Sequence, residues 1–245
     1  MASNTAASSI GTGPVTINPG GTLGGAGLVP GPVACAGTIA PGTGAGKLTF
    51  TNGLNMASVG VYLWELAALL DDSTGTPGTD FDQVALTGGT LTLGGASRIS
   101  VNFTGAATAP NPSDAFWRSP HTWTVVAIGG AATNPSSSDF VTLTNGVYAA
   151  GYFTTTVNAG GSVRLNYTPG PVPQPRMGSP VWVDSTDLVL SFSNALKGAW
   201  WQVQYKSNLN QPTWAVWTTV PAGAGTTFVT NSSSGPQGYF RLLLP

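Results

Sequence analysis

Three of the few carboxylates in this chain of 245 residues are candidates for acid–base chemistry. Glu65 is the only glutamate, and Asp80 and Asp82 lie in the polar segment that follows it. Enzymes that cleave a glycosidic bond place two carboxyl groups beside it, one as acid and one as base or nucleophile. One hypothesis is therefore a polysaccharide hydrolase or lyase that uses Glu65 with Asp80 or Asp82. We favour the alternative, a repeat-edge glutamate with turn-capping aspartates, because a fold alone does not make a catalytic site.

The segment Asp71–Asp82 also has the composition of a calcium-binding loop. It holds four aspartates, and carboxylate oxygens are the ligands that calcium prefers. A dedicated calcium loop has acidic residues at alternate positions followed by a glycine, and this order does not occur here. Calcium is therefore the weaker interpretation of the Asp71–Asp82 loop, and we predict no other cofactor.

His121 is the only histidine, so any Ser–His–carboxylate triad must use it. Ser119 and Asp114 lie near it in the sequence, which makes an ester hydrolase dependent on His121 a further hypothesis. The Gly-x-Ser-x-Gly turn of many ester hydrolases does not occur in the chain. We therefore expect a loop histidine that packs beside Trp117 or Trp123.

Aromatic residues are the strongest sign of a binding function. The chain has eight tryptophans, five of them after residue 180. Exposed aromatic rings stack on the faces of sugars, so the candidate ligand-binding residues are four of these five. Successive residues of a strand face opposite sides of the sheet. We therefore expect one of Trp200 and Trp201 in the core, and likewise one of Trp214 and Trp217. The four candidates are Trp200, Trp201, Trp214 and Trp217.

The elements that would position these residues repeat along the chain. Residues 48–53 return as 84–89, an offset of 36, and residues 54–66 return as 91–103, an offset of 37 after an inserted Thr90. Apolar residues occupy alternate positions in both copies, which is typical of half-buried strands. A repeat of this kind indicates stacked β coils that cover each other's apolar edges. In this register Glu65 pairs with Asn102 and points outward, opposite Trp64 and Val101.

A shorter repeat predicts the length of one coil. Gly13-Pro14-Val15 recurs as Gly31-Pro32-Val33, and Thr22-Leu23-Gly24 has a similar counterpart at Thr38-Ile39-Ala40. The first of these offsets is 18 residues (13 to 31), half of 36, so each coil is expected to take about 18 residues. Glycine and proline clusters between the repeats mark the corners.

The fold class predicted from these patterns is all-β: a parallel β-solenoid (β-helix) segment with loop insertions, followed by a small β-sandwich. The insertions are expected at 70–81, 106–119 and 131–139. The domain boundaries follow from the Pro-rich run after residue 168, which is typical of a stiff spacer. The predicted parts are a frayed or disordered N-terminus at 1–12, the solenoid at 13–168, a linker at 169–179 and the sandwich at 180–245.

Composition excludes several classes of function. Only 7% of residues are charged, against about 25% in ordinary globular proteins, and the net charge is −1. No basic cluster suggests nucleic acid, and no apolar run is long enough to span a membrane. A single cysteine, Cys35, excludes an internal disulfide and a cysteine-cluster zinc site, and we expect it to be buried.

The start of the chain has no recognisable signal peptide, although the low charge and the Gly, Thr and Asn content are typical of secreted proteins. We therefore expect an extracellular or cell-surface protein and hypothesise that the sequence is a gene fragment without its export signal.

Two resemblances support this expectation. Thr22–Gly27, Gly37–Gly42 and Lys47–Phe50, together with Tyr62–Leu66 and Asp80–Val84, resemble the autotransporter-associated β-strand repeat of bacterial surface proteins. That resemblance implies a right-handed parallel β-solenoid, usually the stalk of an exported protein. The tail resembles fibronectin type III-like or immunoglobulin-like modules, through Trp201–Ser207, Trp214, Trp217 and Gly238–Arg241. Such modules bind, space or anchor.

The leading hypothesis is a non-catalytic secreted or cell-surface stalk whose sandwich binds a polysaccharide or a cell-surface glycan. Self-association through the ends of the solenoid is also expected, because open ends expose unpaired strand edges. The glycan-active hydrolase and the ester hydrolase remain the two alternatives.

Overall fold

The computed structural model describes residues 10–171, 173–183, 187–193, 195–196, 199–223, 225–232 and 238–244, with the backbone alone at 231 and 232. The chain divides into two compact units, Met1–Pro171 and Val172–Pro245. This division lies within the range 169–179 that the sequence predicts as a spacer. Most of the N-terminal segment predicted to be frayed, residues 1–9, lies outside the described residues.

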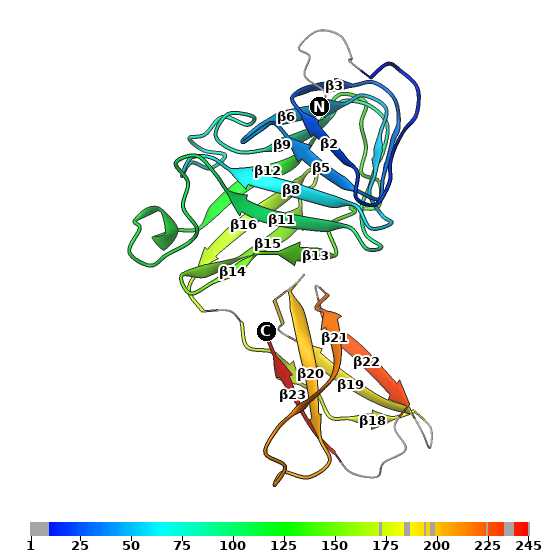
Figure 1. Cartoon of the computed structure of the whole chain (residues 1–245), viewed down its shortest axis with the longest axis vertical. Helices are drawn as coiled ribbons and strands as arrows, with labels where there is room; N and C mark the ends of the chain where they lie inside the picture. Colours follow the sequence, from blue (N-terminus) through cyan, green and yellow to red (C-terminus); the bar gives the residue numbers. More distant parts are fainter. Residues whose placement is uncertain are drawn as a thin grey trace. The chain divides into compact units, whose positions relative to one another are not determined.

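The described residues are all-β, with one 3-10 turn, η1 (Phe116–Arg118), and no α-helix (Figure 1). The short strands of the first unit alternate with turns that contain glycine and proline, which supply the dihedral angles that tight corners need. These strands are β1 (Val15–Ile17), β2 (Thr22–Gly25), β3 (Gly27–Val29), β4 (Val33–Cys35), β5 (Thr38–Pro41), β6 (Lys47–Phe50), β7 (Leu54–Asn55), β8 (Val61–Leu66), β9 (Gln83–Leu86), β10 (Leu91–Thr92), β11 (Arg98–Phe103), β12 (His121–Ile128), β13 (Thr142–Thr144), β14 (Val147–Tyr148), β15 (Gly151–Val157) and β16 (Val163–Pro169).

Three sheets share these strands, and the chain visits them in rotation. Their strand orders are β1-β4-β7-β10, then β2-β5-β8-β11-β13, then β3-β6-β9-β12-β16-β15-β14. The strands of the first two sheets, and β3, β6, β9 and β12 of the third, pair in parallel. Consecutive strands of one sheet therefore come from successive turns of the chain (Figure 1).

The pairing register follows the sequence repeats. Leu48 pairs with Val84, and Trp64 pairs with Val101, as the offsets of 36 and 37 predict. The shorter repeat is confirmed for the first turns, because Val15 pairs with Val33 and Thr22 with Thr38. The expected coil length of about 18 residues is wrong for the later turns, because residues 36 or 37 apart pair directly there. Identical or similar residues thus lie directly above one another in neighbouring turns. Trp64 and Val101 are buried, so the apolar face that alternation predicts does face the core.

The predicted parallel architecture does not extend to residue 168. β15 pairs antiparallel with both β14 and β16, and β16 pairs antiparallel with β12, so the third sheet is mixed. The cause is a tight turn after β15, in which the Asn158 amide donates to the carbonyl of Ser162 and the Asn158 carboxamide accepts from two amides. So short a connection can join only antiparallel strands.

The second unit contains two antiparallel sheets. In one, β19 (Asp187–Ser193) pairs with β17 (Arg176–Met177), β18 (Val181–Trp182) and β22 (Thr227–Ser232). In the other, β20 (Trp200–Lys206) lies between β21 (Ala215–Pro221) and β23 (Tyr239–Leu243). Part of the predicted linker is a strand, because Arg176 and Met177 form β17 and pair with the end of β19. The buried apolar side chains of this unit include Leu190, Phe192, Trp201 and Val203.

Candidate functional site

Asp82 joins three neighbouring segments of the first unit. One carboxylate oxygen, Oδ1, accepts from the Gly46 amide at 2.7 Å, and Oδ2 accepts from the Glu65 amide at 3.1 Å. The carbonyl of Asp82 accepts from Trp64 Nε1 at 2.9 Å. The side chain has no solvent exposure (0%). Asp82 therefore holds the end of β8 against the corner that precedes β6, and no substrate can reach its carboxyl group.

The electrostatics of Asp82 are those of a buried carboxyl group. Burial raises its pKa to about 8, since removal from water disfavours the charged form, and the charge of Glu65 adds to this effect. The hydrogen bonds from Gly46 and Glu65 act in the opposite direction but do not outweigh burial. Raised carboxyl pKa values are common at active sites. Here the pKa of Asp82 is raised because the side chain is buried in a structural hydrogen-bond network, not because it lines a cleft.

Glu65 is where the repeat predicts it. It pairs with Asn102 of β11, and Asn102 Nδ2 donates to Glu65 Oε1 at 3.0 Å. Its side chain is half-buried on the face opposite Trp64. The structure thus brings Glu65 and Asp82 together through backbone contacts, but one carboxylate faces the core and the other an asparagine. This arrangement favours the structural interpretation of the pair over the catalytic one.

The remaining aspartates of the 71–82 loop have separate partners. Asp71 contacts His121, and Asp72 accepts from the amide and hydroxyl of Thr124 at 2.9 and 2.7 Å. Asp80 accepts from the Thr76 amide at 2.8 Å and so caps a turn within the loop. Within the described residues, no group of three or more His, Cys, Asp or Glu side chains is arranged to hold a metal ion. Calcium binding stays a prediction that these contacts do not support.

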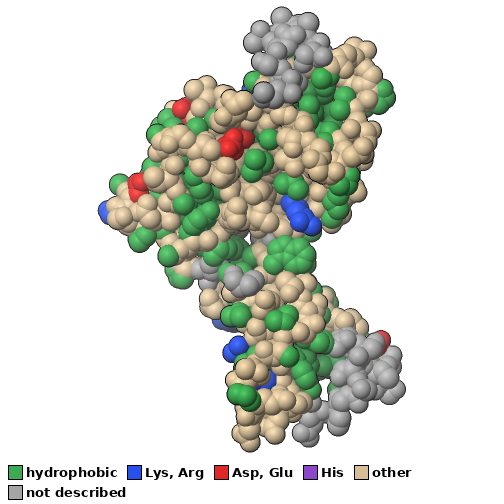
Figure 2. Space-filling view, in the orientation of Figure 1, with side chains coloured by type: hydrophobic (Ala, Val, Ile, Leu, Met, Phe, Trp, Pro, Cys, Tyr) green, Lys and Arg blue, Asp and Glu red, His purple; other side chains and the backbone are tan. Residues whose placement is uncertain are grey.

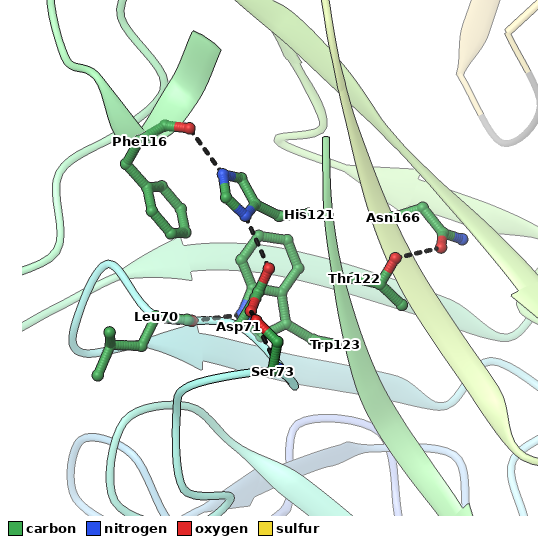
Figure 3. Close-up of polar contacts among 8 residues, drawn as sticks. All are labelled: Leu70, Asp71, Ser73, Phe116, His121, Thr122, Trp123 and Asn166. Carbon is green, nitrogen blue, oxygen red and sulfur yellow. Dashed lines mark hydrogen bonds and ion pairs between the residues drawn. The ribbon is translucent and has the colours of Figure 1, made fainter. Parts of the chain in front are cut away.

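His121 connects two of the predicted insertions (Figure 3). Its Nδ1 lies 2.8 Å from Asp71 Oδ2, and its Nε2 lies 2.6 Å from the carbonyl oxygen of Phe116. Both partners are hydrogen-bond acceptors, so both contacts are satisfied only when the ring carries a proton on each nitrogen. The contact between His121 and Asp71 therefore has the geometry of an ion pair.

This geometry differs from a catalytic triad. A triad needs a serine hydroxyl on the histidine nitrogen that does not face the carboxylate, and that nitrogen here meets a backbone carbonyl. The carboxylate is also a different one from that expected, because Asp114 accepts from the Phe116 amide at 2.9 Å. Partial burial alone would raise the pKa of Asp71, but hydrogen bonds from Ser73 and His121 outweigh it and lower the pKa.

Aromatic rings surround the ion pair. Phe116 stacks on the His121 ring at 3.6 Å with an interplanar angle of 4°, and Trp117 meets it edge-on at 6.2 Å. Trp123 packs beside it and donates from Nε1 to the carbonyl of Leu70 at 2.7 Å (Figure 3). The prediction that His121 packs beside Trp117 or Trp123 is confirmed for both residues.

We expect Asp71→Asn to lower the free energy of unfolding by about 1–3 kcal/mol, because it removes a charge-assisted hydrogen bond between a loop and the start of β12. Asp114→Asn is the matched control, since Asp114 caps a turn without touching His121. Urea denaturation of both variants, alone and combined with His121→Phe, measures the coupling. Coupling of His121 to Asp71 is expected, and equal coupling to Asp114 would contradict the assignment.

The candidate tryptophans of the second unit lie in different environments. Trp201 is buried in the core while its neighbour Trp200 is exposed, so the two face opposite sides of β20 as the alternation predicts. Trp217 is half-buried, and its ring centroid lies 5.2 Å from that of Phe240. Trp214 is half-buried against two basic side chains. Of the four candidates, Trp200 and Trp214 therefore keep solvent-accessible surface and do not pack in the core.

Two residues that sequence reasoning missed flank Trp214. The Arg241 guanidinium carbon lies 4.5 Å from the ring centroid, and Lys206 Nζ lies 5.1 Å from it. Arg241 Nε also donates to Gln204 Oε1 at 2.8 Å. A signal for part of this cluster existed, since Gln202, Gln204 and Lys206 occupy alternate positions opposite Trp201 and Val203. Arg241 is distant in sequence and had no such signal.

A pocket of about 270 Å³ is lined by residues that are close to this cluster in the sequence. Thr213 and Ala215, the neighbours of Trp214, line it together with Tyr205, Gln211 and Pro212. Gly238 lies close to the Tyr205 ring, where a Cβ atom would come within 2.3 Å of the ring. The pocket thus offers one aromatic wall and polar groups beside Trp214, in the loop of residues 207–214 between β20 and β21, here called the Trp214 loop.

No family model matches the chain, and neither a curated protein nor a solved structure matches it. Among the described residues, no helix has the length and apolar character needed to cross a membrane. Figure 2 shows how few charged side chains occupy the visible surface, in keeping with the 7% of charged residues in the sequence.

Proposed function

We propose that this protein is a non-catalytic extracellular or cell-surface stalk whose C-terminal module binds a glycan. In this proposal the three sheets of the first unit are the faces of a β-solenoid, closed by the antiparallel strands β14 to β16. The two sheets of the second unit are the layers of a small β-sandwich. The rotation of the chain through the three sheets supports the first part, and the alternation of buried side chains along β19 supports the second.

The observation that carries the binding function is the surface around Trp214. A half-buried ring, an exposed arginine and side-chain amides lie on one sheet of the second unit. Aromatic rings that keep part of their face in solvent stack on sugars, and neighbouring amides hydrogen-bond to their hydroxyl groups. The described carboxylates of the first unit have structural partners instead, which gives no support to either hydrolase hypothesis.

Self-association belongs to the same proposal. Among the described residues, β1, β2 and β3 are each a terminal strand of one of the three sheets, and each pairs in parallel with its one neighbour. Terminal strands present amide and carbonyl groups to a further strand, so a second copy could continue the sheets.

The test is a pull-down of the purified full chain by a panel of insoluble glycans. We expect at least one glycan to retain the protein, and Trp214→Ala to weaken retention at least about tenfold. Trp182→Ala, at an exposed tryptophan of the other sheet, is the matched control and should bind normally. Polysaccharide or ester hydrolysis that is lost in Glu65→Gln or His121→Ala would overturn the proposal.

A further inference from the structure

The outer face of the β21-β20-β23 sheet is defined by its register. Directly paired residues of an antiparallel sheet point to the same side. Gln202 pairs with Leu243, Gln204 with Arg241, and Lys206 with Tyr239, so these six side chains share the face opposite Trp201 and Val203. Arg241, Tyr239 and Leu243 are exposed on it. We call this set, together with Trp214, the Trp214 face.

Trp214 lies over the centre of this face. Its ring is within cation–π distance of both Lys206 on β20 and Arg241 on β23. Lys206 and Gln204 are buried although their side chains lie on the outer face of the sheet. This burial is expected if the Trp214 loop covers them. The Lys206 ammonium also donates to the carbonyl of Gln211 and so holds that loop in place. The ring is therefore a fixed platform.

The charges of this face are unbalanced. Lys206 and Arg241 are two of the eight basic residues of the chain, and within the described residues neither has a carboxylate partner. The Arg241 guanidinium lies over the Trp214 ring, and its Nε donates to Gln204. Arg241 is exposed, and no hydrogen bond from the other four N–H groups of its guanidinium is found within the described residues.

A guanidinium fork of this kind matches the two oxygens of a carboxylate or the oxygens of a sulfate. A neutral sugar would use the ring and the half-buried amide of Gln202, since the buried Gln204 amide already bonds Gln202 and Arg241. It would leave both cations without a counter-ion. An acidic sugar satisfies all three features at once: its ring stacks on Trp214, its hydroxyl groups meet the Gln202 amide, and its oxyanion meets Arg241.

We infer that the Trp214 face binds an acidic glycan, with the sugar ring on Trp214 and its carboxylate or sulfate on Arg241. This inference rests on the proposed glycan-binding function and names the class of glycan. The Lys206 ammonium, which is held under the loop, adds long-range attraction for the anion rather than a direct contact.

The experiment compares binding of the full chain to polygalacturonate, to its methyl-esterified form, to dextran sulfate, to neutral dextran and to polyglutamate, by calorimetry at two salt concentrations. We expect tight binding to one or both acidic polysaccharides, at least about tenfold weaker binding to the esterified and neutral polymers, and weaker binding at higher salt. The two acidic polymers distinguish a carboxylate from a sulfate ligand.

Arg241→Gln is expected to weaken binding to the acidic polymer at least about tenfold and to leave its melting temperature nearly unchanged. Arg176→Gln, an exposed arginine on the other sheet, is the matched control and should bind as the native chain does. Trp214→Phe keeps a ring on the face and should retain part of the affinity that Trp214→Ala loses.

Any of five results would overturn the inference. Equal binding to acidic and neutral polysaccharides, or to the neutral ones alone, would leave glycan binding in place but remove the role of the oxyanion. Equal losses in Arg241→Gln and Arg176→Gln, or equal affinity for polyglutamate, would indicate general attraction of polyanions. Binding to none of the polysaccharides would overturn the proposed function together with the inference.

Discussion

Gly31→Ala is expected to lower the free energy of unfolding by at least about 2 kcal/mol, whereas Gly13→Ala should leave it unchanged or slightly raised. A Cβ atom on Gly31 would lie 1.9 Å from the carbonyl oxygen of Gly13, one turn of the chain away. That neighbour is backbone and cannot move aside without separating β1 from β4. A Cβ atom on Gly13 would meet nothing within 4 Å.

The two positions form a matched pair, because each glycine precedes a proline and a valine in the same repeated motif. Any effect of alanine on the unfolded chain is therefore nearly the same at both. Urea denaturation of the full chain, followed by fluorescence of the buried Trp64, Trp117 and Trp123, measures the difference. Equal stability of the two variants would show that the turns do not approach each other as closely as the structure has them, and would contradict the proposed solenoid.

The repeat was predictable because stacked turns impose the same demand on each copy. Leu48 and Val84, or Trp64 and Val101, occupy equivalent places on neighbouring strands, so the offset in the sequence is also the pairing register. The position of Glu65 opposite Asn102 followed from that register alone. Period-2 alternation likewise predicted that one of Trp200 and Trp201 lies in the core, and the structure shows that it is Trp201.

The end of the repeat was not predictable from the same signal. β15 and β16 alternate as parallel strands do, and only the tight turn at Asn158–Gly161 makes them antiparallel. The contact between Asp71 and His121 joins a loop to the first residue of β12, 50 residues away, and no periodicity links them. The Trp214 face has the same origin, since Arg241 reaches Trp214 through strand pairing rather than through a local motif.

We expect the stability of the native chain to fall as the pH rises from about 5 to about 8, and Asp82→Asn to abolish most of this dependence. The folded-state pKa of Asp82 is raised to about 8 by burial, above its ordinary value of 3.8. Between these two values the folded chain keeps a proton that the unfolded chain has released. Unfolding then releases a proton, so stability decreases with pH by up to about 1.4 kcal/mol per unit.

At pH 5 the variant is expected to be about 1–3 kcal/mol less stable than the native chain. Asparagine offers one acceptor oxygen where the Gly46 and Glu65 amides each need one, so a buried N–H group loses its partner. This difference in stability should shrink as the pH rises, because only the native chain loses stability when Asp82 ionises. Near pH 9 the variant should be as stable as the native chain or more stable.

Urea denaturation at several pH values, with amide hydrogen exchange at Gly46 and Glu65, checks both parts of the expectation for Asp82. Asp72→Asn is the matched control, since Asp72 is an exposed carboxylate of the same loop and its replacement should preserve the pH dependence of the native chain. Parallel curves for the native chain and Asp82→Asn would mean that Asp82 is ionised in the folded state. The hydrogen bonds from Gly46 and Glu65 would then outweigh burial, and the carboxylate would act as a charged clamp between β8 and the corner before β6.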